Sequence, residues 1–422
     1  MHDGSGGGLG KTGSVSETAV VEIEGHIIDS LILAKILDTI IESGADYRIV
    51  HIDVGRRQTD PSHARIEVVA TDEDSLEALL TDLHPHGAHP VTEPDARLVA
   101  ADTDGVLPRG FYATTNLATS VKVGGHWLHA EPAEMDCALV VAGDRATTTP
   151  MHRVKAGDLV VVGAAGVRVK PLEKPRTPTA GMPDQFAFMT SEISSEKPKG
   201  LIVSQVADRI RSIKAGGGKL LAVCGPAVIH TGAGPDLARL VREHWVDVLF
   251  AGNGFATHDI ESALLGTSLG VSIAQGTAAE GGHANHLRAI NEVRRWGSIA
   301  TGVDEGELKS GVLYECVRAA VPFVLAGSVR DDGPLPDVIT DMVQAQEEMR
   351  RRIDGVRVAL MLSSTLHAIA TGNILPAAVE TYCVDINQAV VTKLADRGSH
   401  QVLGIVTDVG LFVRELAARL CR

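Results

Sequence analysis

The stretch KLLAVCG at residues 219–225 is the first of six apolar runs that decide the fold; the others are VDVLFAGN (246–253), FVLAGS (323–328), VRVALMLSS (356–364), ETYCVDIN (380–387) and QVLGIVTD (401–408). Each run is apolar throughout, which is typical of strands buried on both faces of a parallel sheet. Helical patterns separate them, beginning near Pro235 and Thr257, within about 283–320, and over 337–353 (DVITDMVQAQEEMRRRI). We therefore predict an α/β domain over residues 177–422 with a Rossmann-variant parallel sheet and right-handed crossovers.

The region before this domain has two other patterns. Residues 19–94 alternate strand, helix, strand, strand, helix and strand, which is the ferredoxin-like βαββαβ order. Residues 95–176 carry short β-type runs between Gly, Pro and Asp turns, and predict a small, mostly-β unit. The glycine-rich residues 1–18 are expected to be a disordered tail, in which GLGKTGS lacks the first glycine of a phosphate-binding P-loop.

Composition excludes several classes of protein. The 422 residues carry a formal net charge of -14 and contain no long basic run, which disfavours nucleic acid or an anionic membrane as a partner. No apolar run reaches the length of a membrane span, and the N-terminus has no signal-peptide core. The five cysteines are scattered singly, so we expect no metal site, no disulfide framework and a cytoplasmic location.

The carboxyl ends of the six strands are the expected ligand site, because open parallel sheets bind ligands there. Gly, Ser, Thr, Asn and Asp follow nearly every strand, and glycines with helix N-termini favour a phosphate. Helix capping selects the same residue types, which is the alternative explanation. Neither Gly-Ala-Gly at 232–234 nor Gly-Asn-Gly at 252–254 completes the GxGxxG fingerprint. The predicted cofactor-binding residues are Gly225, Thr231, Gly232, Gly252, Asn253, Gly254, Asp259, Ser363, Ser364, Asp385, Asn387, Thr407 and Asp408.

Two groups of residues are candidates for proton transfer and substrate binding. His367 follows LSST at the start of a helix and is either an acid–base group or a buried imidazole bound to backbone. Arg330, Asp331 and Asp332 end another strand; Arg330 suits a substrate carboxylate, and the aspartates suit an ammonium group or a base. A solvated Asp-Asp-Gly-Pro turn is the alternative for this group.

Two further motifs favour structural roles. His283 and His286 have helical spacing but no third metal ligand nearby, so we expect a structural helix there. Cys224 ends a strand without a base in sequence reach, and a buried thiol is the better interpretation.

Seven longer motifs together resemble one known family. They are FYATTN (111–116), FMTSEISSEKPKG (188–200), AVIHTGAGPDLARL (227–240), GNGFATHDIESALLG (252–266), GGHANHLRAIN (281–291), AGSVRDDGPLPDVITD (326–341) and SSTLHAIATGNILP (363–376). The resemblance, from about Val20 to the C-terminus, is to archaeal-type ornithine cyclodeaminases and the conserved region of lysine-ketoglutarate reductase/saccharopine dehydrogenase bifunctional enzymes.

The resemblance implies an NAD domain similar to that of deoxyhypusine synthase. It puts His367 on that enzyme's catalytic histidine, with Leu366 where a lysine would stand, and Thr407-Asp408 on its cofactor-holding Ala-Asp. It further implies NAD as cofactor, conversion of L-ornithine to L-proline and ammonia, and substrate contacts from Arg330 and Asn116.

Two alternative functions also fit the sequence. One alternative is an NAD-dependent dehydrogenase or lyase of a lysine- or saccharopine-like amino acid. The other is a non-catalytic NAD-binding sensor that uses the ferredoxin-like region. We expect a small-molecule amino-acid substrate and a homo-oligomer, either a dimer or a tetramer.

Overall fold

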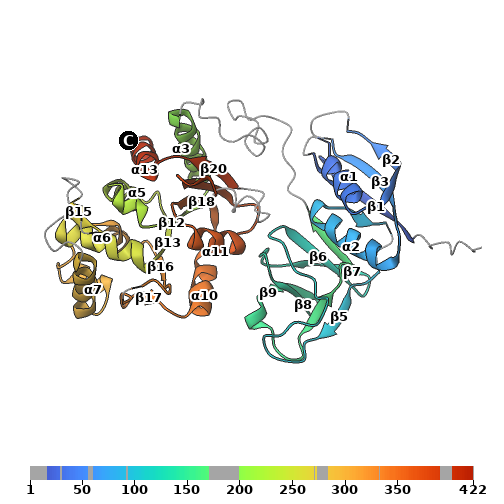
Figure 1. Ribbon diagram of the computed structural model, residues 1–422, viewed down its shortest axis with the longest axis horizontal. Coiled ribbons are helices and arrows are strands. Elements are labelled where there is room, and N and C mark those ends of the chain that lie inside the picture. Colours follow the sequence, from blue (N-terminus) through green and yellow to red (C-terminus); the bar gives the residue numbers. More distant parts are fainter. Residues whose placement is uncertain are drawn as a thin grey trace, which may run out of the picture. The chain divides into compact units, whose positions relative to one another are not determined.

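The computed structural model describes residues 17–28, 31–55, 60–91, 94–170, 199–269, 271–272, 284–331, 333–389 and 402–421. The chain separates into two compact units, Met1–Pro178 and Thr179–Arg422, each of which is described by itself (Figure 1).

The first unit begins with a four-stranded antiparallel sheet in the order β2-β3-β1-β4, the order of a ferredoxin-like fold. Val21 and Ile23 of β1 pair with Ile66 and Ala64 of β3, and these side chains form a core with the two helices. Asp72 caps α2 by accepting a hydrogen bond from the Ser75 amide at 2.8 Å. The elements are β1 (Glu17–Gly25), α1 (Ile32–Glu42), β2 (Asp46–Asp53), β3 (Ser62–Ala70), α2 (Glu73–Leu83), the 3-10 helix η1 (His84–His86) and β4 (His89–Pro90).

A second sheet completes the first unit, with the strand order β11-β6-β7-β9-β8-β10-β5. Its pairings are antiparallel except for the short parallel contact between β7 and β9. The short β-type runs expected within residues 95–176 form its strands. The elements are β5 (Arg97–Ala100), β6 (Ala118–Val123), β7 (His126–Ala130), β8 (Ala138–Ala142), β9 (Arg145–Thr149), the 3-10 helix η2 (Met151–Arg153), β10 (Leu159–Val162) and β11 (Val167–Lys170).

The second unit is built on a parallel sheet in the order β17-β16-β13-β12-β18-β19-β20. All six predicted apolar runs form its strands, in the chain order 3-2-1-4-5-6 of a Rossmann fold. The chain reverses direction across the sheet between β12 and β18, which makes their carboxyl ends the switch point. The strands are β12 (Lys219–Cys224), β13 (Val248–Gly252), β16 (Phe323–Ala326), β17 (Val338–Ile339), β18 (Val356–Leu362), β19 (Glu380–Asp385) and β20 (Val402–Val406).

Helices cover both faces of this sheet (Figure 1). Alternate residues of β12 divide between the faces: Leu220 and Ala222 join one core cluster, while Leu221 and Val223 join the other with Met349 of α10. This division explains why the runs are apolar throughout. The helices are α3 (Lys199–Ala215), α4 (Ala227–His230), α5 (Gly234–Arg242), α6 (Asn253–Leu265), α7 (Asn285–Trp296), α8 (Ile299–Asp304), α9 (Val312–Arg318), α10 (Met342–Arg352), α11 (Leu366–Ile374) and α13 (Val409–Leu420), with a small hairpin of β14 (Thr267–Ser268) and β15 (Val271–Ser272).

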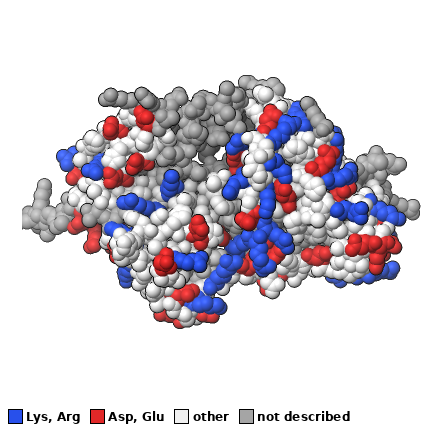
Figure 2. Space-filling view, turned by 180° about the vertical axis from the view of Figure 1, so that it is seen from behind, with Lys and Arg blue, Asp and Glu red and all other residues white. Residues whose placement is uncertain are grey.

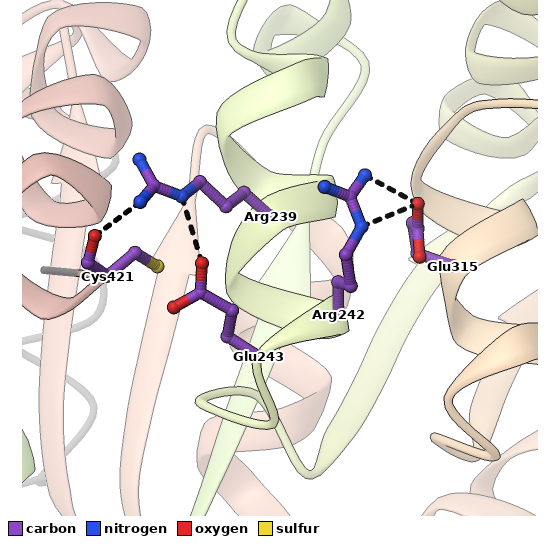
Figure 3. Close-up of polar contacts among 5 residues, drawn as sticks. All are labelled: Arg239, Arg242, Glu243, Glu315 and Cys421. Carbon is purple, nitrogen blue, oxygen red and sulfur yellow. Dashed lines mark hydrogen bonds and ion pairs between the residues drawn. The ribbon is translucent and has the colours of Figure 1, made fainter.

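Helix α5 is anchored at its C-terminal end by two arginines (Figure 3). Arg239 donates to Glu243 at 3.0 Å and to the carbonyl of Cys421, just after α13. Arg242 donates to Glu315 of α9 at 2.6 and 2.9 Å. These contacts hold α9 and α13 beside α5 on one face of the sheet.

Two predicted helix starts were wrong. Helix α6 begins at Asn253 rather than near Thr257, because the buried Asn253 side chain accepts the Leu335 amide at 3.0 Å and no loop intervenes after β13. Helix α10 begins at Met342 rather than at 337, because Val338–Ile339 pairs with β16 as a strand and Asp341 caps the helix. Both differences depend on contacts between segments distant in sequence.

The surface carries charges of both signs. Basic and acidic side chains both occur across the face seen in Figure 2. None of the helices in the described part of the chain combines the length and apolar character required to cross a membrane.

Candidate active site at the strand ends

The imidazole of His367 lies across the ends of two neighbouring strands. It packs against Gly252 at the end of β13, where an added Cβ would stand 2.7 Å from Cε1 and 3.1 Å from Nε2. It also hydrogen-bonds to the carbonyl of Ala326, the last residue of β16. The first turn of α11 therefore places His367 over the carboxyl edge of the sheet, where the sequence predicted it.

The surroundings of His367 favour its neutral form. Burial lowers the pKa of the ring, and the Ala326 carbonyl and the negative charge of Asp331 oppose that shift. A neutral imidazole at neutral pH is able to accept a proton, which a general base requires.

Asp331 is held in a tight turn at the end of β16. Its carboxylate accepts hydrogen bonds from the Ser328 amide at 2.8 Å and the Ser328 hydroxyl at 3.1 Å. Arg330 in the same turn is exposed, and its guanidinium makes no hydrogen bond or ion pair to another described residue. Asp332 lies outside the described residues. The structure thus brings Asp331 near His367 and leaves Arg330 available to a ligand.

At the switch point, a glycine after β12 lies against a serine of unusual backbone conformation after β18. A Cβ at Gly225, after β12, would stand 1.8 Å from the carbonyl oxygen of Ser363, after β18. Ser363 has a φ of 48°, a left-handed conformation that is uncommon outside glycine. The neighbouring Ser364 is buried. Gly225 is therefore required for the approach of the two strands, and backbone strain is stored at the predicted site.

Thr407 and Asp385 meet at the ends of β20 and β19. The Thr407 amide donates to the Asp385 carbonyl at 3.2 Å. The Thr407 hydroxyl is buried and has no hydrogen-bond partner among the described residues. One Asp385 oxygen accepts the Asn387 amide at 2.8 Å. A buried hydroxyl without a partner is uncommon in a native protein and is consistent with a ligand-binding position.

Thr231 and Asp408 also converge, although they follow different strands. A Cβ at Gly410 would stand 2.7 Å from the Thr231 hydroxyl and 3.1 Å from an Asp408 oxygen. Asp408 caps α13 through the Leu411 amide at 2.7 Å, so the capping explanation holds for that oxygen. Gly232, next to Thr231, has a φ of 76° and needs to be glycine for that turn.

Three of the predicted cofactor-binding residues contact other parts of the protein. Both carboxylate oxygens of the buried Asp259 accept amides of α9, from Val312 at 2.9 Å and Leu313 at 2.8 Å, and burial raises its pKa to about 6. Asn253 binds the Leu335 amide, and a Cβ at Gly254 would stand 3.7 Å from Pro226. Asp259 stabilises a helix N-terminus, so we leave it out of the proposed cofactor site.

Asn116 belongs to the first unit and is almost completely buried there. Neither its amide nitrogen nor its amide oxygen has a hydrogen-bond partner among the described residues. Two unpaired polar atoms on one buried side chain are costly unless a ligand satisfies them.

A polar network in the second unit was not predicted. Glu261 accepts hydrogen bonds from His258 at 2.8 Å and Thr267 at 2.7 Å, and the His258 ring lies 4.7 Å from that of His230. The spacing of His258 and Glu261 within GNGFATHDIE places them on one helix face, which was the available signal. His286 lies on α7, as expected, whereas His283 lies outside the described residues. Cys224 is a buried free thiol.

Comparisons with known proteins give the family. The family model "Arginine dihydrolase ArgZ-like, C-terminal, Rossmann fold" matches residues 204–416. The model "Arginine dihydrolase ArgZ-like, C-terminal, first region" matches residues 118–203, and "LOR/SDH bifunctional enzyme conserved region" matches residues 18–117. The ornithine cyclodeaminase of Methanopyrus kandleri is 53% identical over 96% of this chain and 97% of its own length. The chain belongs to the ArgZ-like ornithine cyclodeaminase family.

Solved structures of this family extend the comparison. The apo crystal structure of the cyanobacterial arginine dihydrolase ArgZ has a TM-score of 0.83 and 38% identity, covering 96% of this chain and 58% of that one. The ternary complex of AgrE with ornithine and NAD+ has a TM-score of 0.52 and 42% identity, covering 97% of this chain and 58% of that one. The Rossmann fold predicted from the apolar runs is confirmed by the strand order and the family profile.

The strand ends of this family member fit a dinucleotide. The unpartnered Thr407 hydroxyl, the Asp385 carboxylate and the Thr231–Asp408 pair provide acceptors and donors on one side of the switch point. The N-termini of α6 and α11, directly after Gly252 and Ser364–Thr365, present amides that favour phosphate.

Proposed function

We propose that the chain is an NAD-dependent ornithine cyclodeaminase that converts L-ornithine to L-proline and ammonia. The family supports the reaction, and the AgrE complex is a relative that binds both ornithine and NAD+. The observation that carries the proposal in this chain is the neutral His367 imidazole across the ends of β13 and β16.

The proposed cofactor residues are Thr407, Asp385, Asn387, Thr231, Asp408, Ser363 and Ser364, with Gly225, Gly232, Gly252 and Gly254 allowing close backbone approach. When bound, NAD+ would supply a hydride acceptor for the substrate Cα, and its reduced form would supply the hydride for the later reduction. The protein's part is to orient Cα, to exclude water and to move protons.

His367 is the proposed acid–base group at the α-amine. The α-ammonium would lose a proton to the neutral ring, which leaves the nitrogen lone pair free to form the iminium as hydride departs. The negative charge of Asp331 stabilises the resulting imidazolium. Arg330 is exposed, and its guanidinium makes no hydrogen bond or ion pair with the described residues, so it is the proposed bidentate ligand of the substrate carboxylate.

We propose separately that Asn116, which lies in the first unit, contacts the substrate. Its buried amide donates and accepts at once, which suits a ligand with both an ammonium and a carboxylate group. Asn116→Leu is expected to raise the KM for ornithine while the melting temperature stays unchanged or rises.

The deciding experiment uses purified protein, NAD+ and ornithine. Cyclodeamination releases ammonia and proline in equal amounts with no net NADH. Steady NADH production would indicate instead a dehydrogenase of another amino acid, and NAD+ binding without turnover of an amino-acid panel would indicate a sensor. A cytoplasmic location and assembly as a dimer or tetramer remain part of this proposal, the former suggested by five free, buried cysteines.

A further inference from the structure

The four-stranded sheet of the first unit ends in a long strand that is paired on one side only. Strand β2 is the last in the order β2-β3-β1-β4, and among the described strands it pairs with β3 alone (Figure 1). All eight of its residues, 46–53, are exposed. The outward backbone amides and carbonyls of β2 therefore form a row of hydrogen-bonding groups to which another strand can pair.

Apolar side chains line one face of β2. Tyr47, Ile49 and Ile52 pair with core residues of β3, so they lie on the face of the sheet that the helices cover. Each of the three is nevertheless 37–42% exposed. Ile41 of α1, the helix that contacts β2, is 59% exposed. The apolar layer of the first unit thus reaches the sheet edge without being closed there, and its burial would favour association.

The opposite face of β2 carries two groups of opposite charge. Nε and Nη2 of Arg48 contact Glu67 of β3 at 3.0 Å, and the Arg48 side chain is 72% exposed. Nη1 of Arg48 has no partner among the described residues and can reach a carboxylate beyond the edge. Asp53 lies on the same face as Arg48, because the two pair with His63 and Glu67, which are separated by an even number of residues on β3.

A β-bulge at Val50 makes the edge selective for its partner. Ile49 pairs with Ile66 and His51 pairs with Arg65, which leaves Val50 as the extra residue. Beyond Val50 the alternation of side chains between the two faces is shifted by one position. A regular strand would be in phase with β2 on one side of the bulge and out of phase on the other, which protects the edge from unrelated strands. An antiparallel second copy carries the same shift in reverse and stays in phase along the whole pair.

Two registers of such a pair keep side chains on their own faces over most of the strand. In one register Asp46 lies opposite Asp53 of the second copy, and like charges in that position are unfavourable. In the other register Arg48 lies opposite Asp53 of the second copy, and Ile49 lies opposite Ile52 of the second copy on the apolar face. Charge complementarity therefore selects the second register.

We propose that β2 is the edge along which a second copy of this chain pairs antiparallel, so that the two four-stranded sheets become one continuous sheet. The register is the one that places Arg48 opposite Asp53. Twofold symmetry repeats each of these contacts, as in any isologous interface. This inference rests on the homo-oligomeric assembly that forms part of the proposed function, and it names the surface that makes it.

Charge reversal in the full chain tests the interface, with the mass in solution measured by sedimentation velocity. The unmodified protein is expected at twice the chain mass of 44.4 kDa or at a multiple of that dimer. Asp53→Arg places like charges opposite each other at two positions and is expected to raise the dimer dissociation constant by roughly 10–100-fold. Arg48→Asp is expected to have the same effect, and the combination of both changes is expected to restore association.

The control is Asp82→Arg, the same substitution at an exposed position of α2, and it is expected to leave the mass unchanged. If charge reversal at position 48 disturbs the sheet, Arg48→Ala combined with Asp53→Arg replaces the double variant. Removal of the facing arginine is then expected to recover part of the association lost in Asp53→Arg. Circular dichroism spectra show which variants are folded.

Three results would overturn the inference: a monomeric unmodified protein, an unchanged mass for Asp53→Arg, or no recovery in a folded double variant. Formation of proline and ammonia from ornithine is measured on the same samples. A monomer that carries out this reaction would overturn the interface and leave the proposed reaction standing. An associated protein that responds to the charge changes but does not turn over ornithine would overturn the reaction alone.

Discussion

The backbone of Gly252 and the imidazole of His367 are in direct contact, although 115 residues separate them in the sequence. The contact joins β13 to the first turn of α11 and leaves no room for a side chain at position 252.

Gly252→Ala is expected to reduce ornithine turnover strongly, because the new methyl group would stand 2.7 Å from Cε1 of His367 and displace the ring. Steady-state kinetics measure the effect, and Gly200→Ala is the matched control, since its Cβ would make an ordinary 3.6 Å contact. Normal turnover by Gly252→Ala would mean that the ring position is unimportant.

His367→Asn is expected to keep the fold and to bind NAD+, while turnover falls by roughly 10²–10⁴-fold, the usual range for loss of an acid–base group. Asn retains similar size and hydrogen bonding but does not titrate. A lower melting temperature and weaker NAD+ binding, with activity lost only in proportion, would point to a structural histidine.

Thr407→Val is expected to weaken NAD+ binding by about 5–10-fold, the equivalent of one lost hydrogen bond of about 1–1.4 kcal/mol. The melting temperature without cofactor should stay unchanged or rise, since a buried hydroxyl without a partner becomes a methyl group. Titration calorimetry measures the affinity. Thr371→Val is the control, because that hydroxyl is also buried and without a partner among the described residues, but lies inside α11. Equal losses in both variants would contradict the assignment of Thr407.

The first unit is expected to lose stability in mild acid. Burial lowers the pKa of His84 from 6.5 to about 4 and that of His89 to about 3. The folded state therefore favours the neutral rings, so stability is complete above pH 6.5 and falls as the pH drops from there towards 4. Melting temperatures over this range should show a decline that His84→Asn makes shallower and that His126→Asn, at an exposed site, leaves unchanged. A flat profile in the unmodified protein would show that the buried rings are not responsible.

Much of the fold follows from local pattern. The runs around Leu220 and Leu360 are apolar throughout because both faces of their strands are covered, and that pattern is visible without any structure. Strand β17 is different: two residues make a strand only because β16 lies beside them, so the sequence there favoured a longer helix.

The candidate site was predictable by position more than by role. His367 and Thr407 follow strands whose ends lie on one edge, so their location could be expected. Asp259 fits the same pattern in sequence, yet its carboxylate holds α9, which follows more than fifty residues later and could not be anticipated. The contacts of Thr267, which donates to Glu261 and accepts from Asn285, likewise depend on how separate segments pack.

The close approach of Gly225 to the Ser363 carbonyl has a consequence for redesign. A library that varies position 225 should return only glycine among folded clones, since even an alanine methyl would overlap that oxygen. Position 225 therefore offers no side-chain route for changing the nucleotide preference.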